Sequence, residues 1–171
     1  MQNPVSSAAL SLYPWSEVRA NDRVMRYRRS GTGAAVLLVA PCDGGDALWA
    51  DLPAYLSSRF RLIVPEIRSC PRPDESVVLQ CFLEGLGTPR VAIVAANELC
   101  MPSLELALRN PDQISHLVLV PGGESDGSTV DGTLMTSAPL ESVPLLIVPR
   151  SVAGNEALPL IGRFLAGTMS S

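Results

Sequence analysis

Two short apolar runs enclose an amphipathic stretch between positions 90 and 120, in the segment RVAIVAANELCMPSLELALRNPDQISHLVLV. Residues 90–96 and 114–120 are almost wholly apolar, which is typical of strands buried on both faces of a sheet. Between them, Leu104, Ala107 and Leu108 recur at helical spacing, and Asn110 followed by Pro111 ends the pattern. The segment therefore predicts a strand–helix–strand unit, whose crossover we expect to be right-handed.

The same two periodicities divide the rest of the chain into strands and helices. Apolar runs predict strands at residues 34–40, 60–64 and 143–148, and residues 18–29 alternate like a hairpin that turns at Asn21 and Asp22. Three further helices are predicted from apolar stripes. The first carries Leu48, Leu52, Tyr55 and Leu56, and its Pro53 implies a late start or a kink. The second spans residues 77–86 and is ended by Gly87, and the third is capped by Asn155 and carries Leu158, Ile161, Phe164 and Leu165. This alternation predicts an α/β fold with a mostly parallel sheet.

The two ends of the chain and one long connection differ from this pattern. Residues 1–16 indicate a flexible arm, whose end Tyr13 and Trp15 would pin to the body, and residues 17–171 indicate a single domain. Residues 121–142 are rich in Gly, Ser, Thr and Asp without a helical period, so we expect a long loop there. No signal-type segment and no membrane-length apolar run is visible, which predicts a cytoplasmic protein.

Charge narrows the range of partners. The net charge of -4 argues against nucleic-acid binding. All thirteen basic residues are arginines. Five arginines crowd the predicted hairpin: Arg19, Arg23, Arg26, Arg28 and Arg29. We interpret them as the solvated surface of an edge hairpin rather than as a patch for an acidic partner.

The segment LELALRNPDQISHLVLV resembles the α/β-hydrolase superfamily, in which this region follows the pattern VxLVGHSxGGxxALxLALxxPxxVxxLVLV. The likeness extends upstream through RVMRYRRSGTGAAVLLVAPCDGGDALWADLPAYLSSRFRLIVPEIR and downstream to SVPLLIVP. It implies a three-layer fold, with a mostly parallel sheet, helices on both faces and an N-terminal hairpin. In the family a helical lid usually follows the strand at 114–120, so the loop at 121–142 implies a truncated, lidless member.

The resemblance places a nucleophile elbow, G-x-S-x-G, where this chain has lost the required residues. The five positions are Ala95, Ala96, Asn97, Glu98 and Leu99. An amide such as Asn97 is not an activated nucleophile, although asparagine tolerates the left-handed backbone of a tight turn. Leu99 stands where glycine avoids crowding, and Pro102 predicts that the helix begins near itself rather than directly after Asn97.

The other groups of a catalytic triad are also missing from their places. The only histidine, His116, lies in the predicted strand 114–120 and is interpreted as structural. Pro149, Arg150 and Ser151 stand where the resemblance implies the catalytic acid. The family's HG motif, which shapes the oxyanion hole, is replaced by Ala40 and Pro41, and proline has no N–H to donate.

Cysteines and acids supply the remaining candidates for chemistry. Cys81 falls on an apolar helix face and is predicted to be a core residue, whereas Cys42, Cys70 and Cys100 follow strands of the parallel sheet. These three cysteines could converge at the carboxyl edge of the sheet as a thiol cluster, which is the less favoured interpretation. Cys100 lies near a helix start, where a thiol could have a lowered pKa. Acids near Arg68 and Arg150 are expected to form ion pairs. The candidate ligand site comprises Cys42, Asp43, Glu66, Asn97, Glu98, Cys100 and Arg150, with no metal and no cofactor.

Two functions remain open. The first is a degenerate hydrolase that binds rather than hydrolyses, as a homo-oligomer, as a partner in a heteromeric complex or as a carrier of a small apolar ligand. The second is an enzyme with altered chemistry, such as an isomerase, cyclase or lyase that uses Glu98, Asp43 or a cysteine. A filled site with Leu99 packed inward would favour the first function, and a pocket faced by Glu98 would favour the second. The strand at 143–148 matches either the penultimate or the final strand of the family.

Overall fold

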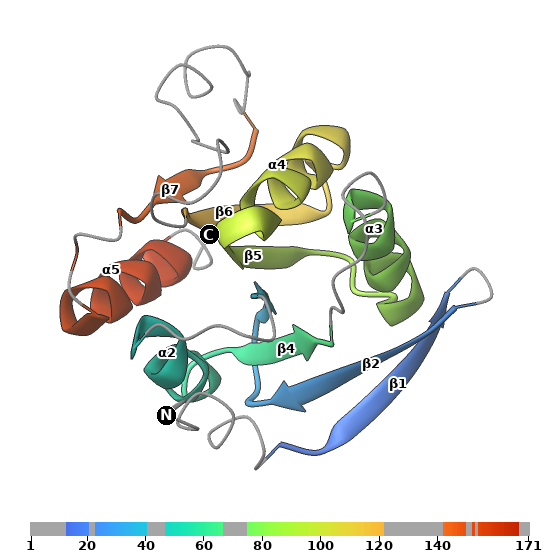
Figure 1. Cartoon of the computed structure of the whole chain (residues 1–171), viewed down its shortest axis with the longest axis horizontal. Helices are drawn as coiled ribbons and strands as arrows, with labels where there is room; N and C mark the ends of the chain where they lie inside the picture. The colour runs from blue at the N-terminus through green and yellow to red at the C-terminus, as the bar shows by residue number, and fades with distance from the viewer. Residues whose placement is uncertain are drawn as a thin grey trace.

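The computed structural model describes residues 13–20, 23–40, 47–66, 75–121, 142–149, 152 and 154–167. Within these residues, seven strands form one sheet in the order β1-β2-β4-β3-β5-β6-β7 (Figure 1). The strands are β1 (Trp15–Ala20), β2 (Arg23–Ser30), β3 (Ala35–Val39), β4 (Arg61–Pro65), β5 (Val91–Ala96), β6 (Ile114–Val120) and β7 (Leu145–Ile147). β2 pairs antiparallel with both β1 and β4, and every other pairing is parallel. The predicted mostly parallel sheet with an N-terminal hairpin is confirmed.

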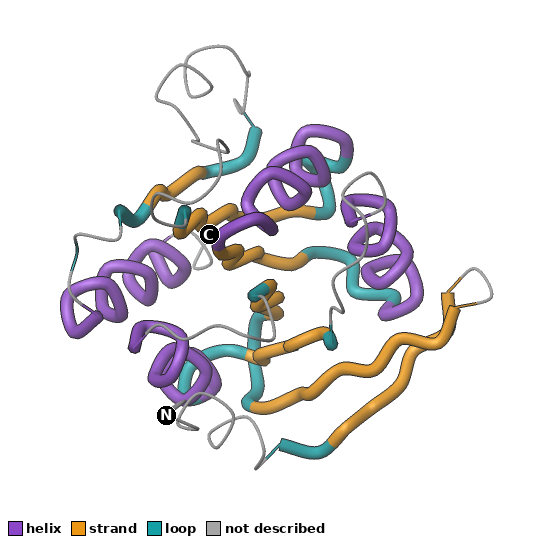
Figure 2. Tube along the Cα trace, viewed as in Figure 1, coloured by secondary structure: helices purple, strands orange, loops and turns teal. Residues whose placement is uncertain are grey.

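Helices cover both faces of this sheet (Figure 2). On one face lie α3 (Glu75–Leu86) and α4 (Cys100–Arg109), whose core joins Leu37, Ile93 and Phe82. On the other face lie α2 (Ala47–Ser57) and α5 (Gly154–Gly167), whose core joins Val36, Val94 and Leu52. Successive residues of a strand point to opposite faces, so β3 and β5 feed both cores in turn. The three-layer α/β architecture is therefore confirmed.

The central strand β5 is buried at all six positions. It pairs with β3 on one side and with β6 on the other, and β6 is buried along its whole length. Strands enclosed in this way read as continuous apolar runs, which is why residues 90–96 and 114–120 were recognisable in the sequence. Both strands end at the edge of the sheet where the α4 connection begins.

Strand ends depart from prediction where local chemistry intervenes. β1 begins at Trp15 rather than at residue 18. β7 retains only three of the residues predicted at 143–148, because Pro144 has no N–H for a ladder, although Val143 and Val148 are both buried. β7 pairs directly with β6, which favours the penultimate strand of the family as its match. The turn at 21–22 and most of the connection at 121–142 lie outside the described residues.

Three details of the helices differ from prediction, and for α2 the difference concerns only the first of the two alternatives expected from Pro53, a late start or a kink. Leu108 is 41% exposed, while Leu106 is buried on α4 beside Leu104 and Ala107. α2 runs from Ala47 through Pro53 without the predicted late start. α5 begins at Gly154, so Asn155 is its second residue rather than its cap. Helical spacing alone did not distinguish Leu106 from Leu108, because both fit an apolar stripe and the packing against β5 and β6 decides between them.

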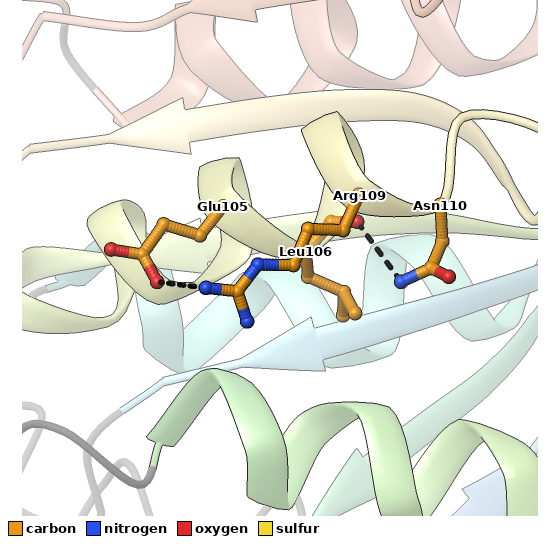
Figure 3. A network of polar contacts seen from close by, with 4 residues as sticks. All are labelled: Glu105, Leu106, Arg109 and Asn110. Atoms are coloured by element: carbon orange, nitrogen blue, oxygen red, sulfur yellow. Dashed lines mark hydrogen bonds and ion pairs between the residues drawn. The ribbon is translucent and has the colours of Figure 1, made fainter.

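Asn110 ends α4 as its sequence position predicted. Its backbone N–H donates to the Leu106 carbonyl at 2.9 Å, and its side-chain Nδ2 donates to the same oxygen at 3.4 Å (Figure 3). One turn earlier, Glu105 and Arg109 form an i,i+4 ion pair at 3.9 Å. Because both side chains are half exposed or more, this pair adds little to stability, and the helix depends mainly on its buried face.

The hairpin forms one edge of the sheet. Trp15 is 42% exposed, and the guanidinium carbons of Arg28 and Arg26 lie 4.2 Å and 4.6 Å from its ring centroid. Trp15 and Arg28 are opposed across the two strands, so their contact is a cross-strand cation–π pair. Ahead of this strand, the Tyr13 hydroxyl lies 3.0 Å from Ser57 Oγ on α2. In the described part of the chain, no helix is long and apolar enough to span a membrane.

Candidate functional site

The candidate site lies where β5 ends and α4 begins, at the carboxyl edge of the parallel strands. Ala96 is still extended, with φ -124° and ψ 151°, whereas Asn97 has φ +51°. Asn97 is the only residue other than glycine with a positive φ among the described residues. The left-handed turn that asparagine tolerates is therefore present at Asn97, whose short polar side chain suits this conformation.

The prediction that the α-helix begins near Pro102, rather than directly after Asn97, is confirmed to within two residues. A single 3-10 turn, η2 (Asn97–Leu99), follows β5, and α4 starts at Cys100, whose N–H bonds to the Asn97 carbonyl. Pro102 is therefore the third residue of α4, within the first turn, where a missing N–H is least costly. Met101 is helical despite preceding a proline, so the packing of this turn overrides the local preference.

Leu99 occupies the position where the elbow pattern has its second glycine. It is only 2% exposed and belongs to the same buried cluster as Ala95, Cys100 and Leu104. The crowding expected of a side chain at this position is avoided, because the 3-10 turn directs Leu99 into the core between α4 and the sheet. The turn is thus filled by an apolar side chain.

The prediction of a lowered pKa for Cys100 was also wrong. Burial raises the pKa of this thiol from 9.0 to about 12, and a hydrogen bond with the backbone of Val120 offsets the rise only in part. Its Sγ donates to the Ala95 carbonyl at 3.5 Å. The helix start favours a thiolate, but the loss of hydration outweighs it here, so Cys100 is a protonated core residue at neutral pH.

The acids of the predicted ligand site have separate environments. Glu98 is exposed. Glu66 lies at the end of β4, where its carboxylate is 4.0 Å from the guanidinium of Arg26 and its N–H donates to the Arg26 carbonyl at 2.8 Å. An ion pair for Glu66 is therefore present, with Arg26 from the hairpin. The remaining members, Cys42, Asp43 and Arg150, and also Cys70 and Arg68, lie outside the described residues.

His116 is buried near the start of β6, opposite Ala92 of β5. Its ring makes an edge-on contact with Phe164 of α5, with centroids 5.4 Å apart. Burial lowers the pKa of His116, and the charge of Arg90 lowers it further. Asn97 follows β5 five residues after Ala92, so the histidine is about 16 Å from the elbow along the strand. These positions support the structural reading of His116.

Two buried polar residues at the starts of helices were not predicted. Glu75 begins α3 and is buried, two residues before the predicted start of this helix at residue 77. Ser103 on α4 is fully buried, and its Oγ has no hydrogen-bond partner among the described residues. Its spacing from Cys100 and Ala107 places it on the inward face, so the helical period could have found it. In the described ranges, no cluster of three metal-binding side chains occurs.

Leu99→Ala should lower the free energy of unfolding by about 2–5 kcal/mol, because it removes a core side chain and leaves a cavity. Leu108→Ala is the matched control on the same helix, and its exposed side chain should change stability by about 0.5 kcal/mol or less. Urea unfolding followed by circular dichroism measures both variants. Equal losses in the two would show that Leu99 is not a core residue.

Cys100 should resist alkylation in the native chain. A rise in pKa from 9.0 to about 12 reduces the thiolate fraction at pH 8 about a thousandfold. Because the thiolate is disfavoured in the folded state, Cys100 should also make folding less stable as pH rises from about 9 toward 12. Iodoacetamide labelling at pH 8, read by peptide mass spectrometry with and without urea, tests this. Rapid labelling of the native Cys100 peptide would contradict it.

Mycobacterial proteins resemble the chain in sequence. The uncharacterized proteins Rv2715 of Mycobacterium tuberculosis (strain ATCC 25618 / H37Rv) and Mb2734 of Mycobacterium bovis (strain ATCC BAA-935 / AF2122/97) are each 28% identical to it over 145 residues. The match covers 79% of this chain but 39% of each relative, so the chain spans about two fifths of their length. No protein-family model matches the chain.

Solved structures resemble its fold. The carboxylesterase CesB from Bacillus subtilis gives a TM-score of 0.55 at 20% identity, covering 68% of this chain and 47% of that one. The haloalkane dehalogenase DbeA from Bradyrhizobium elkani USDA94 gives 0.54 at 18% identity, over 63% and 41%. The epoxide hydrolase CorEH gives 0.54 at 18% identity, over 72% and 49%. Identities this low carry a fold but no activity. The strand order, the turn at Asn97 and these likenesses together show that the chain has the α/β-hydrolase fold.

Proposed function

We propose that the chain is a pseudo-hydrolase, which uses this fold to bind or assemble with another molecule rather than to hydrolyse a substrate. The observation that carries the proposal is the packing of Leu99 inside the elbow, where it is 2% exposed. A working elbow keeps its neighbours small so that the nucleophile stands clear on a strained turn. Here the turn still has a left-handed residue, Asn97, but the side chain of Leu99 packs beneath it in the core.

The groups available at the turn support this reading. Asn97 stands at the nucleophile position, and its amide lacks the activation that a hydroxyl or thiol receives from a neighbouring base. The nearest thiol in sequence, Cys100, has a pKa raised to about 12 by burial. A protonated, buried thiol is inert as a nucleophile. At the position where hydrolases hold an activated nucleophile, this chain has side chains, Leu99 and Cys100, that pack in the core.

The alternative, an enzyme with altered chemistry, would need an acid or a thiol facing a substrate. Glu98 is exposed, and the carboxylate of Glu66 lies beside the guanidinium of Arg26. Cys100 is packed in the core. Each of these described candidates has a structural or solvated environment, so binding or assembly remains the function we propose.

The apolar end of the sheet indicates the kind of partner. β7 and its flanks, Val-Pro-Leu-Leu-Ile-Val over residues 143–148, carry no charge, and the three residues of β7 are half-buried on a strand at the end of the sheet. A half-covered apolar strand favours contact with another polypeptide or with a small apolar ligand. We therefore place the proposed binding function at this end of the sheet.

The chain should show no serine-hydrolase activity. A fluorophosphonate probe should leave it unlabelled, and p-nitrophenyl esters should hydrolyse at the rate of buffer. Asn97→Ser is the informative variant, because it restores a hydroxyl at the elbow while His116 stays buried against Phe164. A serine without a base has only a small fraction of a triad's rate, so this variant should also remain silent.

A serine hydrolase run in the same assay supplies the positive control. Stoichiometric labelling of the natural chain would overturn the proposal. Robust ester turnover by Asn97→Ser alone would show that a general base faces the elbow.

A further inference from the structure

The outer side of β7 has a defined set of backbone groups. The Leu117 N–H donates to the Pro144 carbonyl and the Val148 N–H donates to the Leu119 carbonyl, both at 2.9 Å. Residues 144 and 148 therefore direct these groups toward β6. Backbone groups alternate along a strand, so Leu145 and Ile147 direct their N–H and C=O groups away from β6. No strand pairs with that outer side in the part of the chain that the structure describes.

The side chains of β7 extend both cores to this edge. Leu145 and Ile147 pack against the core on the α4 face, and Leu146 packs against the core on the α5 face. All three are half-buried. Another strand added at this edge would therefore find apolar neighbours on both of its faces, as the inner strands do.

We propose that β7 pairs antiparallel with β7 of a second copy, across a two-fold axis that passes beside Leu146, so that two sheets join into one. This proposal rests on the proposed function, since it names the partner of a non-catalytic assembly. In this register Leu145 faces Ile147 of the other copy, and Ile147 faces its Leu145. Each facing pair exchanges two hydrogen bonds, so all the outward groups of both strands are satisfied.

The absence of charge permits a second copy at the β7 edge. A two-fold contact sets two copies of the same segment against each other, so a charge at the axis meets its own like. The segment 143–148 carries no charge, so no like charges meet in the proposed pair. β1 at the other edge exposes Glu17 and Arg19, and charged residues on an edge strand generally discourage strand pairing.

The flanks of β7 limit the contact to its three residues. Sliding the two copies by two residues in one direction would set Leu145 opposite Pro149, which has no N–H to donate. Sliding them in the other direction would set Ile147 opposite Val143, which lies in a bend ahead of the strand. Both slides lose strand pairing, so the register that centres on Leu146 is the favoured one.

Sedimentation velocity across about 1–200 µM should show a monomer–dimer equilibrium. Ile147→Pro removes one outward N–H and leaves the ladder to β6 intact, because proline is tolerated on edge strands when its nitrogen faces away. We expect it to weaken the dimer at least tenfold while circular dichroism stays unchanged. Ile147→Val keeps the N–H and should dimerise like the natural chain. A folded Ile147→Pro variant that still dimerises would overturn the proposal.

Disulfide trapping tests the register without depending on that variant. In the proposed pair the Cα atoms of the two Leu146 residues are about 4.5 Å apart, within the range that a disulfide bridges. With Cys42 and Cys70 replaced by serine, Leu146→Cys should oxidise to a covalent dimer. Leu145→Cys should not, because its two copies lie about 7–8 Å apart. A monomer at all concentrations with no trapping at residue 146, or trapping at both positions alike, would refute the pairing.

The possible outcomes distinguish a failure of the β7 pairing from a failure of the pseudo-hydrolase proposal. A monomer that stays unreactive toward fluorophosphonate removes the self-pairing and leaves the pseudo-hydrolase proposal standing. A dimer with the predicted trapping pattern that also hydrolyses esters supports the pairing and removes the non-catalytic reading. A monomer that binds a different protein through β7 overturns the self-pairing as well.

Discussion

The structure depends on how the chain leaves β5. Every residue of β5 is buried, so the backbone must reverse at its end without exposing polar groups inside the sheet. Asn97 provides the reversal with φ +51°, and one 3-10 turn then leads directly into α4. This arrangement places Leu99 and Cys100 in the core rather than beside an open turn. The burial that comes with this packing also raises the pKa of the Cys100 thiol, which therefore stays protonated at neutral pH.

Much of the fold followed from the sequence because its inner strands are buried on both faces. The apolar run at 114–120 coincides with β6, and Asn110 ends α4 where it was expected. The helical conformation of Met101 was not predictable, since the rule against helical residues before a proline is local and tertiary packing overrides it here. The pKa of Cys100 failed for a similar reason: helix position can be read from a sequence, but depth of burial cannot.

The two ends of the sheet have opposite character. At β1, exposed charges and the stacking of Arg26 and Arg28 on Trp15 give a solvated edge. At β7, an uncharged strand between two cores presents outward backbone groups. Natural sheets usually protect their edges with charge, and the β7 edge has no such charge. The strand pairing that we propose would cover this edge. The packed elbow and the uncharged outer side of β7 are both consistent with the proposed assembly role.

The central claim is that the elbow is filled by Leu99. Its most direct test is the solvent accessibility of leucine methyl groups in solution, measured by NMR with a soluble paramagnetic gadolinium chelate. The account predicts that the Leu99 methyls relax as slowly as those of buried Leu106, and far more slowly than those of Leu108 on the same helix. Relaxation of Leu99 as fast as that of Leu108 would mean an open elbow and would contradict the account.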